Sequence, residues 1–336
     1  MTRGGYILIF LILPLLLEKS IYAMSEEIVV AVSIEGLAPL VWEIGGDYVR
    51  IVTILPSGVE PHHYNLEPSV IEKAVESDLI FISGHIGWEE SLVEAVSERT
   101  GRDVGEISLN PLTDVENLTF INIGGGRNLH GYWIYPPNAV EIGRKLMEKL
   151  SSVRPTLKEY FERRFESFRR KIDKLWSELK RAGEEAGLYG ESVVIAFPAE
   201  AYVVVAAGMN VGATLIEEAG VGVKPTVIED ARRGLLEGRY AAIFISDIGL
   251  QNPVYEWVEK LGEETGKPIV VVKVFPIPGI YNFDSIFSFN IGSILSQKTG
   301  VLRTMGEGEF YLSVIAILCL VLIGISIVFI RWGRER

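Results

Sequence analysis

Short apolar runs alternate with helical patterns along most of the chain, and this alternation restricts the possible folds more than any other feature. The apolar runs lie at residues 28–34, 49–55 and 78–83 in a first block, and at residues 193–197, 241–246 and 269–275 in a second. Strands that alternate with helices form a mostly parallel sheet with helices on both faces. The sequence therefore predicts an α/β fold with two parallel-sheet lobes.

A long helical pattern separates the two blocks. From about residue 156 to residue 186, apolar side chains recur at spacings of three and four, and charged residues fill the other positions. About thirty helical residues would extend about 45 Å. We therefore expect one long rigid helix over residues 154–188, which joins a first lobe at residues 26–153 to a second lobe at residues 189–299.

The N-terminal region is typical of a secretory signal peptide. Residues 6–17 form an uncharged apolar run of 12 residues, and Arg3 precedes it. A run of this length is too short to span a bilayer and suits the hydrophobic part of a signal peptide. We expect residues 1–25 to be a signal peptide, and an uncleaved N-terminal anchor is the alternative.

The C-terminal region predicts a membrane anchor. Residues 311–330 contain no charged side chain, and a helix of 20 residues covers about 30 Å, the thickness of the hydrocarbon core. The tail at residues 331–336 carries three arginines, and short basic tails stay in the cytoplasm. We expect a single-pass transmembrane helix in the cell membrane, linked to the body by residues 300–310, with the body on the extracytoplasmic side.

The charge and the cysteine content narrow the possible partners. The net charge of −12 disfavours nucleic acid, and it suits either a cationic ligand or an ordinary acidic surface. The single cysteine, Cys319, lies in the expected membrane helix. The exported body therefore has no disulfide, and its stability must come from packing.

The four histidines of the chain all fall in the first lobe: His62, His63, His85 and His130. Three of them follow the ends of predicted strands, where open α/β sheets bind their ligands. Imidazole is the commonest side-chain ligand of transition metals. His62 and His130 come from separate loops and form half of a candidate metal site. Histidines without a metal, at the surface or in the core, remain the alternative on spacing alone.

Three segments of the first lobe resemble one family of proteins. Residues 57–64 read SGVEPHHY, residues 78–84 read DLIFISG, and residues 130–139 read HGYWIYPPNA. They resemble the first metal-ligand segment, the following strand and loop, and the second metal-ligand segment of the zinc and manganese solute-binding proteins of ABC transporters, the ZnuA/TroA/PsaA family. The resemblance covers roughly residues 28–299, and the long helix matches the rigid linker of these proteins.

The resemblance implies a metal site in the cleft between the lobes. His62, which follows Pro61, and His130 match the two first-lobe ligands of the family. His63 falls on a position whose side chain usually points away. His85 matches no family ligand, and we expect it to line or gate the cleft or to support a ligand through a hydrogen bond.

The second lobe departs from the family pattern. Phe197 occupies the third ligand position and cannot bind a metal; Glu200, three residues on, is either the replacement ligand or a carboxylate in the first turn of the next helix. Tyr281 occupies the fourth position; Asp284, three residues on, is either a ligand or the N-cap of a helix. The expected metal ligands are therefore His62, His130, Glu200 and Asp284.

The resemblance implies a function without catalysis. The family resemblance implies that this chain is the extracytoplasmic solute-binding protein of a transition-metal importer. We expect it to be a monomer that docks on ABC permease subunits with a cytoplasmic ATPase. Two imidazoles and two carboxylates suit Zn²⁺, Mn²⁺ or Fe²⁺, and the Irving–Williams order favours zinc. One alternative is a metal-free relative that acts as a cell-surface interaction protein, since the third ligand is missing. The other is a metal-dependent hydrolase, although the sequence has no HExxH motif.

Overall fold

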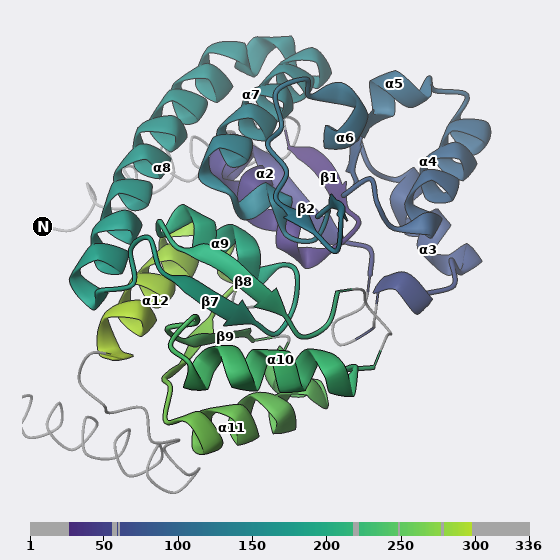
Figure 1. The fold of residues 1–336 in the computed structure, drawn as a ribbon. Coiled ribbons are helices and arrows are strands. Elements are labelled where there is room, and N and C mark those ends of the chain that lie inside the picture. Colours follow the sequence, from purple (N-terminus) through teal and green to yellow (C-terminus); the bar gives the residue numbers. More distant parts are fainter. Residues whose placement is uncertain are drawn as a thin grey trace, which may run out of the picture. The chain divides into compact units, whose positions relative to one another are not determined.

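The computed structural model describes residues 27–55, 59, 61–217, 222–247, 249–276 and 279–297. The described residues up to Leu295 belong to one compact unit, which holds two α/β lobes and one long helix (Figure 1). Each lobe is built around its own parallel sheet.

The sheet of the first lobe has four parallel strands in the order β2-β1-β3-β4. They are β1 (Ile28–Val32), β2 (Val49–Thr53), β3 (Leu79–Phe81) and β4 (Ser108–Leu109). The two central strands, β1 and β3, are buried along nearly their whole length. Parallel strands covered on both faces read as continuous apolar runs, which is why these two were recognisable as IVVAV and LIF.

Helices connect these strands: α2 (Ala38–Gly45), α3 (Pro68–Val75), α4 (Gly87–Thr100), α5 (Val104–Ile107), α6 (Pro111–Asp114) and α7 (Pro136–Val153). A two-stranded antiparallel hairpin of β5 (Asn122–Ile123) and β6 (Gly126–Arg127) stands between α6 and α7. Proline occupies the first turn of α2, α3, α6 and α7, where the N–H that it lacks has no partner inside the helix.

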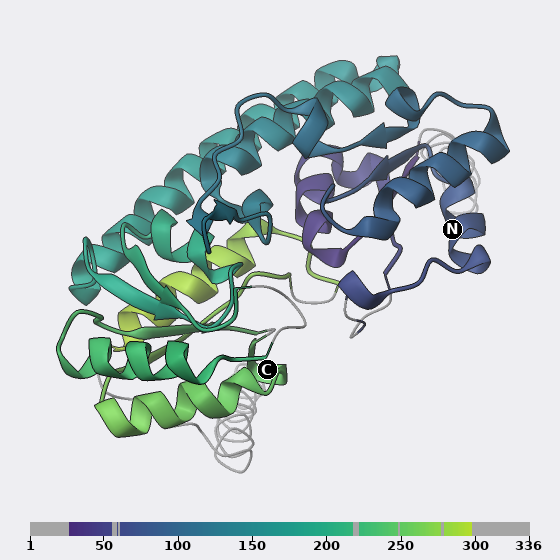
Figure 2. The ribbon, with the colours of Figure 1, turned by 45° about the vertical axis from the view of Figure 1, so that its right-hand side comes forward.

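The second lobe repeats the strand order of the first. Its parallel sheet has the order β10-β9-β7-β8, so in both lobes the first strand lies between the second and the third. The strands are β7 (Ser192–Ile195), β8 (Asn210–Thr214), β9 (Ile243–Ser246) and β10 (Ile269–Val272). The helices are α9 (Glu200–Ala206), α10 (Pro225–Leu236), α11 (Val254–Thr265) and α12 (Phe283–Ser296). Helices α10 and α11 lie side by side (Figures 1 and 2).

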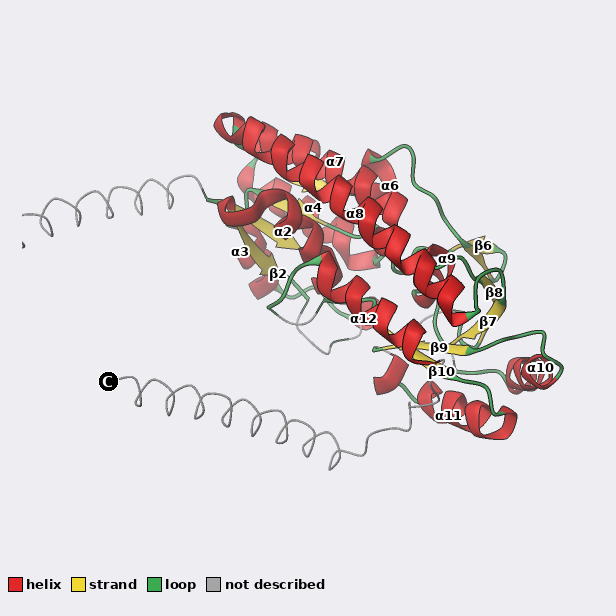
Figure 3. Cartoon of the chain, turned by 90° about the vertical axis from the view of Figure 1, so that its left-hand side faces the viewer, coloured by secondary structure: helices red, strands yellow, loops and turns green. Residues whose placement is uncertain are grey.

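The linking helix α8 spans Lys158–Ala186 and runs beside α7 (Figure 3). Its buried face carries apolar side chains at helical spacing: Phe161, Phe165, Phe168, Ile172, Leu175 and Leu179. This helix contacts α2 and α7 of the first lobe and α9 of the second. At the second-lobe end, the indole N–H of Trp176 donates to the carbonyl oxygen of Ala206 at 3.0 Å.

The predicted fold class, two parallel-sheet lobes joined by a long helix, is confirmed. Two edge strands, β4 and β8, have no counterpart among the predicted strands. The predicted signal peptide at 1–25, connector at 300–310, transmembrane helix at 311–330 and tail at 331–336 lie outside the described residues. Within the part of the chain that the structure describes, no helix has both the length and the apolar character needed to cross a bilayer.

Candidate metal centre

Three of the four histidines gather in the first lobe. His62, His85 and His130 each offer a ring nitrogen, and these nitrogens lie within 4.8 Å of one another. The Nε2 atoms of His62 and His130 are 3.3 Å apart. Among the described residues, this histidine group is the one set of three or more histidine, cysteine or carboxylate side chains with such spacing. His63 is exposed and is not part of the group.

The loop after β2 carries His62 in a short 3-10 turn, Pro61–His63. The indole N–H of Trp88, in the first turn of α4, donates to the carbonyl oxygen of Pro61 at 3.0 Å. The ring of Tyr64 packs edge-on against Trp88, with the ring centroids 5.4 Å apart. Because Trp88 is buried, the turn is anchored to the first lobe while the side chain of His62 stays exposed.

The loop between β3 and α4 carries His85 and is organised by Glu89. The side chain of Glu89 is fully buried, and its carboxylate accepts the backbone N–H groups of Ser83, Gly84 and Ile86 at 2.8, 2.8 and 3.1 Å. It also accepts the hydroxyl of Ser83. The oxygen of that hydroxyl lies 2.9 Å from Nδ1 of His85. One buried carboxylate therefore fixes the loop that presents this histidine.

The loop before α7 carries His130 and is bonded to the second lobe. The backbone N–H of His130 donates to Oδ1 of Asn128 at 2.9 Å. Nδ2 of Asn128 donates to the carbonyl oxygen of Pro198 at 2.7 Å, and the hydroxyl of Tyr202 donates to the backbone carbonyl of Asn128 at 2.5 Å. Second-lobe groups therefore help to hold a first-lobe histidine in place.

The residues that follow His130 complete this packing. Gly131 has a φ of 79°, and a Cβ at this position would lie 3.2 Å from the Cβ of Ala199, just before α9. Both the positive φ and the close approach favour glycine here. The hydroxyl of Tyr132 donates to the carbonyl oxygen of Ser83 at 2.8 Å, which joins this loop to the loop that follows β3.

The surroundings of His85 keep its imidazole neutral. Burial is the largest cause, followed by the charges of His130 and His62, and together they lower the pKa of His85 to about 3 against the opposing effect of a hydrogen bond to the backbone of Ser83. The ring of Trp133 stacks against it, with the centroids 6.2 Å apart and the planes at 30°. A neutral imidazole keeps a lone pair for a metal ion at neutral pH.

The family model of ZnuA, described as "Zinc-uptake complex component A periplasmic", matches residues 30–279. This chain belongs to the ZnuA family. The match covers most of both lobes and includes the loops of all three histidines of the group.

Curated relatives of the chain are binding proteins of metal transporters. The manganese ABC transporter substrate-binding lipoprotein PsaA of Streptococcus mitis is 28% identical over 164 residues, which cover 47% of this chain and 52% of PsaA. The iron ABC transporter substrate-binding lipoprotein MtsA of Streptococcus pyogenes serotype M1 is 25% identical over 183 residues, 53% of this chain and 58% of MtsA. The chain therefore spans little more than half the length of these relatives.

Several solved structures share the fold of this chain. A crystal structure of ZnuA has a TM-score of 0.64 at 15% identity and covers 81% of this chain and 98% of that protein. The solute-binding protein FpvC of Pseudomonas aeruginosa, in complex with Mn²⁺, has a TM-score of 0.65 at 16% identity. The match covers 83% of this chain and 99% of FpvC. At these identities the likeness establishes the fold alone.

Glu200, expected as a second-lobe ligand near Phe197, has other partners in the structure. It begins α9, is fully buried, and accepts the backbone N–H groups of Ala196, Phe197 and Ser246 at 2.7, 2.9 and 2.6 Å. Burial raises the pKa of Glu200 to about 7. Its carboxylate thus holds the ends of β7 and β9 together, and it is not part of the histidine group. The arrangement supports the alternative that sequence left open, a carboxylate in the first helical turn.

Asp284, the other expected second-lobe ligand, belongs to an ion-pair network instead. Lys171 on α8 pairs with Asp284 at 2.8 Å and with Glu43 on α2 at 3.0 Å. Asp284 does not cap α12 either, because Oδ1 of Asn282 accepts the backbone N–H of Ser285 at 2.8 Å. The network connects α2, α8 and α12, and Asp284 is not part of the histidine group.

Glu89 and Glu200 have similar roles in the two lobes, because each is a fully buried carboxylate that accepts backbone N–H groups near strand ends. Glu89 binds the segment that follows β3, whereas Glu200 binds the segment that follows β7 and the end of β9. In the first lobe, Ser83 connects this carboxylate to a histidine, whereas the second lobe contains no histidine. The two lobes therefore share a support, and the first lobe alone uses it to hold an imidazole.

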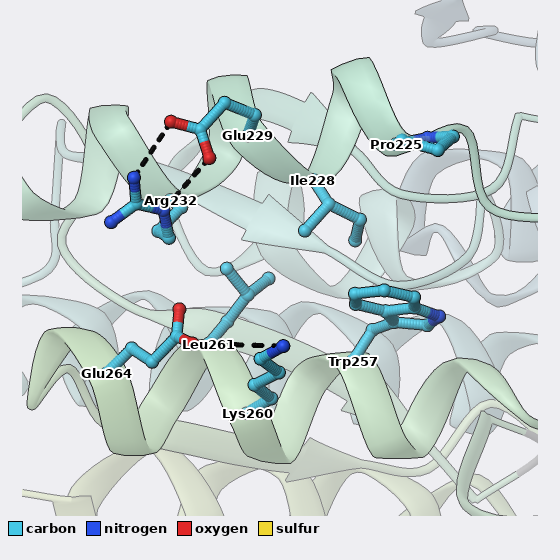
Figure 4. A pocket seen from close by; sticks show the side chains of 8 residues that line it. All are labelled: Pro225, Ile228, Glu229, Arg232, Trp257, Lys260, Leu261 and Glu264. Carbon is cyan, nitrogen blue, oxygen red and sulfur yellow. Dashed lines mark hydrogen bonds and ion pairs between the residues drawn. The ribbon is translucent and has the colours of Figure 1, made fainter.

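A groove lies between α10 and α11 of the second lobe (Figure 4). It is lined by Pro225, Ile228, Glu229, Arg232, Trp257, Lys260, Leu261 and Glu264. Arg232 pairs with Glu229 at 2.8 Å, and Lys260 pairs with Glu264 at 3.9 Å. Because these charged side chains pair with one another along the helices, they do not converge on a ligand position. The histidine group is the better candidate for a functional site.

Proposed function

We propose that this protein is the extracytoplasmic solute-binding component of an ABC-type transition-metal importer. The observation that carries the proposal is the convergence of His62, His85 and His130. Membership of the ZnuA family supports it, as do relatives named as substrate-binding lipoproteins of manganese and iron ABC transporters. In this proposal the protein binds and delivers an ion and is not an enzyme.

The cargo that we propose is Zn²⁺, with Mn²⁺ and Fe²⁺ as the alternatives. Imidazole nitrogens suit zinc, and the Irving–Williams order places zinc above manganese and iron at equal geometry. Manganese prefers carboxylate and water oxygens. The two carboxylates expected from the sequence, Glu200 and Asp284, are bonded to backbone N–H groups and to Lys171. A nitrogen-rich group therefore favours zinc.

We further propose that the body is tethered to the outer face of the cell membrane. Residues 1–25 would direct export and residues 311–330 would span the bilayer. The curated relatives are named lipoproteins, and the helix would supply the anchorage that a lipid gives them. A tether raises the local concentration of the loaded monomer near permease subunits driven by a cytoplasmic ATPase.

Metal titration of the purified full chain tests the cargo proposal. Zn²⁺, Mn²⁺ and Fe²⁺ would each be titrated in competition with a chromophoric chelator, which gives the dissociation constants. We expect the chain to bind Zn²⁺ more tightly than the other two ions. A chain that retains none of them would instead support a metal-free relative that acts as a cell-surface interaction protein.

Truncation before Phe310 tests the tether proposal. The shortened chain should leave the membrane fraction and stay folded, because the expected membrane helix lies outside the sheets and helices of the two lobes. Fractionation of cells and circular dichroism of the soluble fraction give the two readouts. Aggregation or misfolding of the truncated chain would show that the C-terminal segment belongs to the body.

A further inference from the structure

The hydrogen bonds around Ser83 determine where the proton of His85 lies. The hydroxyl oxygen of Ser83 is 2.8 and 2.9 Å from the two carboxylate oxygens of Glu89 and 2.9 Å from Nδ1 of His85. A serine hydroxyl has one hydrogen and can donate it in one direction only. The direction in which Ser83 donates therefore decides whether Nδ1 of His85 is a donor or an acceptor.

The backbone fixes the Glu89 end of this chain of hydrogen bonds. Three backbone N–H groups, those of Ser83, Gly84 and Ile86, donate to the two carboxylate oxygens, so both oxygens act as acceptors. If the Ser83 hydrogen pointed at His85, its oxygen lone pairs would face both carboxylate oxygens at less than 3 Å, which is repulsive. Ser83 therefore donates to Glu89 and accepts from Nδ1–H of His85.

A neutral imidazole carries one ring proton, and a proton on Nδ1 leaves Nε2 as the nitrogen with a free lone pair. Nε2 is then the nitrogen of His85 that can bind a metal together with His62 and His130. Metal-binding histidines usually donate the N–H of their other ring nitrogen to an acceptor, as Nδ1–H of His85 does here. We propose that His85 is a third metal ligand through Nε2, and that Ser83 and Glu89 are positioning residues that fix its tautomer and ring orientation.

This inference rests on the proposed function, because it names a ligand of that same site. It departs from the family pattern, in which His85 matches no ligand position. In this inference the fully buried Glu89 has two roles: it binds the backbone of its loop and, through Ser83, it fixes the tautomer of His85. Glu200 has only the first of these roles. Glu200 accepts backbone N–H groups at strand ends of the second lobe, and it is not a member of the histidine group.

X-ray absorption spectroscopy of the zinc-loaded full chain counts the imidazoles directly. Multiple scattering from His ligands should fit three imidazoles in the wild type and two in a His85→Asn variant, whose zinc affinity should fall at least about tenfold. A wild type with two imidazoles, or a His85→Asn variant with unchanged affinity, would overturn the assignment of His85 and leave the proposed function standing. A wild type that binds no metal would instead overturn the proposed function.

Nitrogen NMR of the metal-free chain, labelled with ¹⁵N-histidine, tests the positioning residues. We expect His85 to carry its proton on Nδ1 in the wild type, and to lose this preference in Ser83→Ala, with zinc affinity falling about 10- to 100-fold. Ser33→Ala is the matched control, since the buried Ser33 hydroxyl accepts the N–H of Ser83 at 3.3 Å, whereas the hydroxyl that lies against Nδ1 of His85 is that of Ser83. A wild-type His85 protonated on Nε2 would refute the relay. So would equal effects of the two alanine variants.

A second variant protects the test against simple misfolding. If the circular dichroism spectrum of Ser83→Ala shows that this variant does not fold, Ser83→Thr takes its place in the test. Threonine keeps the hydroxyl, so this variant should keep both the Nδ1 tautomer and the zinc affinity. A threonine variant that folds but shows the Nε2 tautomer would contradict the role of the hydroxyl. The tautomer itself is the decisive readout, because a purely structural serine would leave it unchanged.

Discussion

The side-chain amide of Asn128 in the first lobe donates to the carbonyl oxygen of Pro198 in the second at 2.7 Å. The same side chain accepts the backbone N–H of His130 at 2.9 Å, so one buried amide connects the loop of His130 to the start of α9. The second lobe therefore influences the proposed site through the backbone of the loop that carries His130.

Replacing Asn128 by Ala should weaken metal binding as well as stability. The variant removes two hydrogen bonds, one from the N–H of His130 and one to the carbonyl of Pro198, and the loss of a buried hydrogen-bond partner costs about 1–3 kcal/mol. With its loop less fixed, His130 should lose about tenfold in zinc affinity. Asn210→Ala is the control, because Asn210 makes a similar bond to the backbone of Gly190 at an exposed position. Equal zinc affinities for the two variants would show that the loop does not depend on Asn128.

Replacing Glu200 by Ala should destabilise the second lobe and leave the metal site intact. Three backbone N–H groups would lose their acceptor in a fully buried place, so we expect a loss of at least about 2 kcal/mol of unfolding free energy. Denaturant unfolding of the metal-free chain measures this loss. Zinc affinity of the folded variant should match the wild type. A tenfold loss of affinity would return Glu200 to the list of ligands.

Glu200 should also give the stability a pH dependence that Glu200→Gln removes. Burial raises the pKa of Glu200 from its ordinary value of 4.5 to about 7, so the folded state binds this proton more tightly than the unfolded state does. Its contribution to stability is complete below pH 4.5 and is lost as the pH rises toward 7, by about 3 kcal/mol at most. The free energy of unfolding of the Gln variant should therefore rise relative to that of the wild type as the pH increases from 5 to 7. A constant difference between the two across this window would contradict the shift.

His62 and His63 should differ sharply although they are neighbours in the sequence. His62→Ala removes a member of the histidine group, and we expect zinc affinity to fall at least about tenfold. His63→Ala should change it less than about twofold, since His63 is outside the group. Chelator competition measures both. A larger loss for His63 would show that the wrong histidine is assigned.

The ion-pair network of Lys171 should contribute to stability and not to metal binding. Lys171→Met leaves the buried carboxylate of Glu43 without its cation, which should cost about 3 kcal/mol. Asp284→Asn keeps that inner pair and removes only a half-exposed one, so its cost should stay below about 1 kcal/mol. Thermal unfolding gives the ranking. A loss of zinc affinity in the Asp284→Asn variant would support its expected role as a ligand.

The predicted strands succeeded where burial made the sequence simple. β1, β3, β7 and β9 are central strands whose side chains are nearly all buried, so each reads as an apolar run. The strands that were missed, β4 and β8, lie at the edges of their sheets. β4 has two residues, and β8 reads NVGAT with partly exposed side chains, so neither carries the apolar signal of a buried strand.

The sequence predicted those members of the histidine group that stand in local motifs. His62 and His130 stand in recognisable segments, and both join the histidine group. His85 was not expected as a ligand, because its place in the group depends on three loops that meet only in the folded lobe. The local signal was a histidine after a strand with Glu89 four residues on. The role of Glu200 could not be decided from the sequence, because a carboxylate after a strand can bind backbone N–H groups as readily as a metal.

The three imidazoles of the histidine group all come from loops of one lobe, and this has a consequence for the kinetics of loading. Association slows when binding must wait for a conformational change. The bonds that join the His130 loop to the second lobe are already formed in this structure, so the three imidazoles need not wait for the two lobes to approach. Ion capture should therefore proceed at a rate set by encounter. Discrimination between ions then lies in the dissociation rate, that is, in how long each ion stays bound.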